Sequence, residues 1–113
     1  MDIKLRSLSK NDEFKELLNG NKISSKYGTF FFKKLINKDI KNFNISVVTK
    51  KKLGKANIRI KIKRRIKNIL QSALKNTNIN FEYSYLFIAK KNVFDDDFNV
   101  IKEYIFSDLK KIK

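Results

Sequence analysis

The segment from Lys55 to Asn76 constrains the fold more than any other part of the sequence, because a regular apolar pattern and a series of basic side chains run through it together. Its apolar residues recur at the three- and four-residue spacing of a helix packed on a sheet; these are Ile62, Ile66, Ile69, Leu70, Ala73 and Leu74. The opposite side of the helical wheel is polar; it carries Asn57, Lys61, Arg64, Asn68, Gln71 and Lys75. Lys63 and Lys67 fall at the boundary, where long stems can cover the core, and Arg59 falls near the apolar side. The sequence therefore predicts a long helix with one buried face and one basic face.

Weaker patterns before and after this helix predict the other elements. A first helix is expected from Ser9, which can cap it, to Asn19. A last helix is expected to open at Asp95 to Asp97, with these side chains facing inward: Phe98, Ile101, Ile105 and Leu109. Strands are expected over residues 21–25, 29–35, 45–49 and 85–89, and a basic loop over 50–54. This α-β-β-β-α-β-α order predicts one domain over residues 1–113 of the α+β class, a two-layer sandwich with a mixed sheet of about four strands.

The distribution of charge indicates a polyanionic partner. The net charge is +16 over 113 residues, far beyond what solubility needs, and residues 40–81 contain no Asp or Glu. A solvated surface is the ordinary interpretation of a run of charge on a helix. This helix, however, lacks the acids four residues away that usually accompany exposed basic side chains. Phosphates are therefore the expected counter-charge.

Absent residue types narrow the functional classes. The chain has no Cys and no His, which excludes a disulfide framework and the commonest general base and metal ligand. No stretch resembles a signal peptide or has the length of a membrane span. We expect a cytoplasmic protein that binds no metal or other cofactor by itself and does not act at a membrane.

The motif KKKLGKANIRIKIKRRIK, residues 50–67, resembles the signature of the protein subunit of bacterial ribonuclease P. The segments NDEFKELLNG, ISVVT and YLFIAKKNVFDDDF resemble that family's first helix, the strand before the motif, and the last strand with the entry to the last helix. The resemblance covers nearly the whole chain in the family's order. It departs at two positions, where Ile60 replaces an Asn and Lys61 replaces an Arg. Lys61 keeps the charge but loses the bidentate fork of a guanidinium.

The resemblance implies both a fold detail and a function. The family fold contains a left-handed βαβ crossover, an exception to the usual right-handed rule. The protein is implied to be an accessory subunit of an endoribonuclease whose catalytic RNA, with bound Mg²⁺, removes the 5′ leader from precursor tRNA. Its implied partners are the catalytic RNA and precursor tRNA, and we expect a monomer in a complex of one protein and one RNA. No residue of the protein itself is expected to be catalytic.

Two sets of site residues follow from the motif and the resemblance. The expected RNA-binding residues are Lys51, Lys52, Asn57, Arg59, Lys61, Lys63, Arg64 and Lys67. The expected lining of a cleft for the tRNA leader is Phe14, Leu18, Phe30 and Phe32. Strand alternation places Phe30 and Phe32 on one face and Phe31 on the other, and a register shift of one residue would exchange the two sets. Burial in the core is the competing interpretation of each ring.

Two other functional classes compete with this hypothesis. The acids from Asp95 to Asp97 could bind Mg²⁺ in a metal nuclease, although capping of the last helix and its favourable dipole are the preferred explanation. The second alternative is a ribosomal-type protein that binds structured RNA without belonging to an enzyme.

Overall fold

A five-stranded sheet forms the centre of the protein in its computed structural model, which describes residues 5–7, 11–34 and 42–112. The strands lie in the order β1-β4-β5-β3-β2. Their bounds are Leu5–Arg6 for β1, Asn21–Ser24 for β2, Gly28–Lys33 for β3, Phe43–Val48 for β4 and Ser84–Ala89 for β5. The β1, β4 and β5 strands run parallel, whereas β3 is antiparallel to both β5 and β2. The sheet is therefore mixed, as the sequence predicts.

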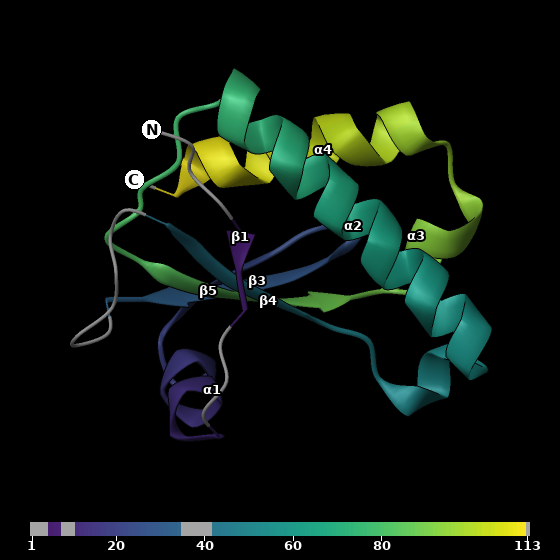
Figure 1. Ribbon diagram of the computed structural model, residues 1–113, viewed down its shortest axis with the longest axis horizontal. Helices are drawn as coiled ribbons and strands as arrows, with labels where there is room; N and C mark the ends of the chain where they lie inside the picture. The colour runs from purple at the N-terminus through teal and green to yellow at the C-terminus, as the bar shows by residue number, and fades with distance from the viewer. Residues whose placement is uncertain (1–4, 8–10, 35–41, 113) are drawn as a thin grey trace.

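Helices lie on both faces of this sheet (Figure 1). The long helix α2, Ala56–Asn76, and the last helix α4, Phe98–Lys111, cover one face, and the short helix α3, Asn92–Asp95, lies near the N-terminal half of α2. The helix α1, Asn11–Leu18, packs against β3 and β5 on the other face. The sheet and the α2–α4 layer form the expected two-layer α+β sandwich, and α1 partly covers the second face.

The apolar stripe of α2 supplies much of the main core. Its buried side chains are Ile62, Ile66, Ile69, Leu70 and Ala73. From α4, the core receives Ile101, Ile105 and Leu109. The buried faces predicted for both helices are therefore confirmed. Phe98, expected to face inward with them, is partly buried and packs against the same core.

A tight turn sets the start of α2. The 3₁₀ helix η1, Lys51–Leu53, follows β4, and the buried Leu53 fixes it to the core while Lys51 and Lys52 stay exposed. Gly54 then adopts a φ of +142°, a backbone conformation that side-chain-bearing residues rarely adopt. The basic loop expected here is thus a fixed turn that places two lysines beside the first turn of α2.

The structure differs from the expected element order in two places. The two-residue strand β1 pairs with β4 and raises the number of strands from about four to five. The last helix α4 opens at Asp97, as expected, where the carboxylate accepts a hydrogen bond from the Val100 amide at 3.4 Å, but the short helix α3 precedes it and was not expected; the chain is extended at Asp96 and Asp97 between the two. The expected cap Ser9 and the expected strand end Leu35 lie outside the described residues.

Candidate RNA-binding surface

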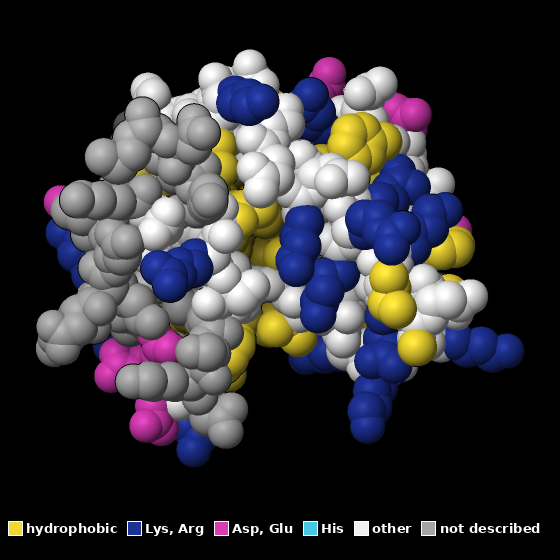
Figure 2. Space-filling view, viewed as in Figure 1, with side chains coloured by type: hydrophobic (Ala, Val, Ile, Leu, Met, Phe, Trp, Pro, Cys, Tyr) yellow, Lys and Arg dark blue, Asp and Glu magenta, His cyan; other side chains and the backbone are white. Residues whose placement is uncertain are grey.

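The basic face of α2 is open to solvent. The exposed members of the predicted RNA-binding set are Lys51, Lys52, Asn57, Lys61, Lys63, Arg64 and Lys67. Arg59 is half-buried. Figure 2 shows the Lys and Arg side chains gathered over α2, with hydrophobic atoms between them. Within the described residues, no carboxylate lies within ion-pair distance of these cations. Their charge is therefore available to a polyanion.

Three adjoining hollows form a groove along this side of α2, which we call the basic groove. The first has a volume of about 140 Å³ and is lined by Thr49, Ala56, Arg59, Ile60 and Lys63. The second, of about 330 Å³, shares Ile60 and Lys63 and adds Arg64, Lys67 and Asn68. The third, of about 320 Å³, shares Lys67 and Asn68 and reaches Leu5 and Ser7 beside β1. The shared residues place the three hollows side by side along α2, and the third reaches the β4–β1 edge of the sheet.

Arg59, which lines the first hollow, has an unfilled hydrogen-bonding position at its Nε. Its Nε is buried and has no hydrogen-bond partner among the described residues. A buried donor without a partner costs about 1–3 kcal/mol, and more when it is charged. Arg59 also lines the first hollow, so other atoms of its side chain border the groove.

The other side of α2 uses its basic residues within the fold. Arg65 donates from Nη2 to the carbonyl oxygen of Asp96 at 2.7 Å and from Nη1 to that of Phe94 at 3.3 Å. Lys61 places its Nζ 4.6 Å from the ring centre of Phe94. Arg65 thus ties α2 to the α3–α4 junction, a role that no local pattern in the sequence predicts. Lys61 lies on this flank rather than among the residues that line the basic groove.

The second predicted surface lies on the sheet face that α1 partly covers, and we call it the α1 face. Leu17 and Leu86 are buried there, and four half-buried side chains pack against them: Phe14, Phe31, Val48 and Ile88. Leu18, also predicted for this site, is 48% exposed on α1 and is not part of the cluster. Phe14 therefore lies on the expected face and shares it with Phe31.

The assignment of Phe30 and Phe32 to a leader cleft is wrong. Phe30 is 0% exposed, and its ring centre lies 4.5 Å from that of Phe87. Phe32 is 9% exposed in the same core. Alternation along β3 then places Phe31, between them, on the α1 face. The alternative register, which the sequence left open, is the one that the structure adopts.

Two of the three acids from Asp95 to Asp97 have structural partners. Asp97 caps α4, and the Tyr27 hydroxyl donates to Asp96 Oδ2 at 2.7 Å. Burial and the Asp96 carboxylate together raise the pKa of Tyr27 to about 12. In the described ranges, no three carboxylate, His or Cys side chains are grouped so that they could hold a metal ion. The capping interpretation accounts for Asp97.

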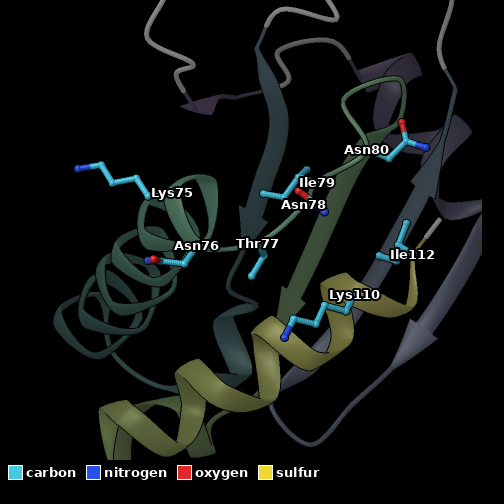
Figure 3. A pocket seen from close by; sticks show the side chains of 8 residues that line it. All are labelled: Lys75, Asn76, Thr77, Asn78, Ile79, Asn80, Lys110 and Ile112. Atoms are coloured by element: carbon cyan, nitrogen blue, oxygen red, sulfur yellow. The ribbon is translucent and has the colours of Figure 1, made fainter.

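A larger hollow of about 680 Å³ lies away from both surfaces, at the C-terminal end of α2 (Figure 3). It is lined by Lys75, Asn76, Thr77, Asn78, Ile79, Asn80, Lys110 and Ile112. Thr77 Oγ1 donates to the Ala73 carbonyl, and Asn76 Nδ2 donates to that of Ser72, both at 2.9 Å. These local bonds terminate α2, and none of the predicted site residues lines this hollow.

None of the described helices has the length and apolar character of a membrane span.

The chain is similar to known proteins over nearly its whole length. The sequence profile of the family described as Ribonuclease P matches residues 3–113. The ribonuclease P protein component of Carboxydothermus hydrogenoformans is 36% identical over 97% of this chain and 93% of its own length. That of Fusobacterium nucleatum is 32% identical over 95% of this chain and 89% of its own length. In fold, the chain is similar to the RNase P protein from Thermotoga maritima, with a TM-score of 0.78 and 24% identity over 96% of this chain and 98% of that one.

A small α+β protein with a row of basic hollows along its longest helix has the features of an RNA-binding protein. The chain belongs to the ribonuclease P protein family. Proteins of this family are accessory subunits of the endoribonuclease that matures the 5′ end of tRNA, and they help its RNA component to process precursor tRNA. This membership decides against a ribosomal-type protein without an enzyme and against a metal nuclease.

Proposed function

We propose that the protein uses two separate surfaces in this task. The basic groove, with Lys51, Lys52 and Asn57 beside it, binds the backbone of the ribonuclease P RNA. The α1 face receives the 5′ leader of precursor tRNA. The complex contains one protein and one RNA, it works in the cytoplasm, and its Mg²⁺ is held through the RNA.

The proposal that the basic groove binds RNA rests on the unpaired charge of this groove. Four of its lining residues are basic: Arg59, Lys63, Arg64 and Lys67. No described carboxylate neutralises them. Cationic side chains gathered in one groove repel one another unless a polyanion binds among them. Side chains in the groove can contact successive phosphates and release the counterions condensed on the RNA.

Half-exposed aromatic rings support the proposal that the α1 face binds the leader. Phe14 and Phe31 are each half-buried on the α1 face, so that part of each ring remains accessible. Such rings can stack on unpaired bases without reading their sequence, which suits leaders that differ between tRNA precursors. The α1 face lies on the opposite side of the sheet from the layer that contains α2. Binding of the RNA subunit and binding of the leader can therefore be separated by mutation.

Two titrations test the proposal. The first measures affinity of the protein for the ribonuclease P RNA over a series of salt concentrations, and we expect a steep linear fall of log K with log salt. The second compares precursor tRNA with mature tRNA on the assembled enzyme at constant Mg²⁺, and we expect the protein to increase affinity only for the precursor. A flat salt dependence contradicts the groove assignment. An equal gain for mature tRNA contradicts the leader assignment.

A further inference from the structure

Ile60 is an exposed apolar side chain in the middle of the basic groove. It is 56% exposed, more than the other large exposed apolar residues of the described chain, which are Leu18, Val100 and Tyr104. Single apolar residues on a protein surface are common and carry no meaning by themselves. The surroundings of Ile60 distinguish it, because it lines both of the hollows at the N-terminal end of the groove.

The position of Ile60 gives the groove an apolar ridge with a basic rim. On one side lies the hollow with Arg59 and Thr49, and on the other lies the hollow with Arg64 and Lys67. The small apolar side chain of Ala56, one turn earlier on α2, also lines the first hollow. An apolar centre surrounded by polar side chains is typical of the part of an interface that contributes most to affinity.

An isoleucine side chain makes no favourable contact with phosphate oxygens, because it can only displace the water that solvates them. Double-helical RNA presents phosphates, hydroxyls and the edges of its bases, and its bases are stacked on one another. The apolar parts of RNA that could cover Ile60 are the face of a base and the carbons of its ribose, and these are accessible where a nucleotide is unpaired. A hollow of about 330 Å³ lies at the lower end of the range for small-ligand sites, which suits one nucleotide rather than a helix.

We propose that Ile60 packs against the base or ribose of one unpaired nucleotide of the ribonuclease P RNA. Lys63, Arg64 and Lys67 bind the phosphates that flank it. This inference rests on the proposed function, because it requires the RNA subunit in the basic groove, and it adds which kind of nucleotide the groove takes. The contact is apolar and therefore persists at salt concentrations that weaken the phosphate contacts.

The test is a salt series with the full protein and its cognate ribonuclease P RNA. For Ile60→Ala we expect roughly tenfold weaker binding at every salt concentration, as for the loss of a partly buried aliphatic side chain. The slope of log K against log salt should stay that of the wild type. Ile60→Lys should also bind more weakly when extrapolated to 1 M salt, although it adds a positive charge. Val100→Ala, at an exposed apolar site on α4, is the matched control and should bind like the wild type.

Opposite results overturn the inference. Ile60→Ala with wild-type affinity throughout, or Ile60→Lys with tighter binding and a steeper slope, would place phosphates at this position. A wild-type protein without a steep slope would instead contradict the proposed function itself, so the two failures are distinguishable. Because Ile60 is exposed, its variants should keep the wild-type melting temperature, which checks that folding is not the cause.

Chemical probing of the RNA identifies the nucleotide. Acylation of ribose 2′-hydroxyls reports unpaired, mobile nucleotides. We expect wild-type protein to suppress the reactivity of at least one such nucleotide and Ile60→Ala to restore it, while Val100→Ala does not. Suppression that is identical in wild type and Ile60→Ala at every nucleotide contradicts the inference.

Discussion

The Nζ of Lys61 lies 4.6 Å from the centre of the Phe94 ring, which joins the basic face of α2 to α3. Lys61 is exposed, so its ammonium can contact this ring and a phosphate at the same time. A cation above an aromatic face at such a site contributes about 0.5–1 kcal/mol. The ring therefore holds the side chain in place on the flank of α2 that faces α3, outside the basic groove.

This pair gives the first prediction. In a double-mutant cycle of Lys61→Ala and Phe94→Leu, we expect a coupling of about 0.5–1 kcal/mol in the free energy of unfolding by urea. Lys61→Ala should also reduce the salt slope of RNA binding by nearly one phosphate contact, whereas Phe94→Leu should keep the slope. No coupling between the two residues would mean that the contact does not stabilise the fold.

The second prediction concerns Arg64. Arg64→Ala should reduce the slope of log K against log salt by about 0.7–0.9 if it makes one phosphate contact. Lys75→Ala is the matched control, because it removes one exposed charge from the same helix but outside the basic groove. Equal changes in slope for both variants would indicate a general effect of net charge rather than a contact made by Arg64.

The third prediction uses the adjacent rings of β3. Phe31→Ala should weaken binding of precursor tRNA to the assembled enzyme by about 1–3 kcal/mol and leave mature tRNA unchanged, if its ring stacks on one base. Phe30→Ala, one residue away but in the core, should instead cost about 3–5 kcal/mol of folding stability without a preference for either tRNA. Phe14→Ala should behave like Phe31→Ala. Titrations with both tRNAs and a thermal melt of each variant separate the two behaviours, and a stability loss alone at Phe14 and Phe31 would remove them from the leader site.

The fourth prediction concerns stability at high pH. The pKa of Tyr27 rises to about 12 in the folded protein from 10.0, because the phenol is buried and donates to Asp96. Because the folded protein favours the protonated phenol, the contribution of Tyr27 to stability is fully present below pH 10. It is lost as the pH rises through about 12. Urea unfolding at pH 8, 10.5 and 11.5 should show a smaller loss of stability for Tyr27→Phe than for the wild type.

Local periodicity determined the parts of this structure that depend on one element alone. The spacing of Ile62, Ile66 and Ala73 predicted the buried face of α2, because a helix repeats every 3.6 residues whatever its neighbours are. By the same argument, the exposure of Arg64 followed from its position on the wheel. The order of motifs along the chain carried the resemblance to ribonuclease P proteins, and with it the expectation of two separate RNA-contacting surfaces.

Only the tertiary structure decided questions that depend on what lies opposite a side chain. Alternation in β3 separates Phe31 from Phe30 and Phe32, but which face meets the main core depends on where α2 and α4 pack, and no local pattern contains that information. Arg64 and Arg65 are neighbours in one basic run, yet Arg65 is used within the fold because the chain at Asp96, some thirty residues later, brings its carbonyl within 2.7 Å. Two of the three hollows of the basic groove likewise exist only because α2 packs beside the β4–β1 edge: Thr49, next to β4, completes the first, and residues of β4 and β1 complete the third, whereas α2 forms the second by itself.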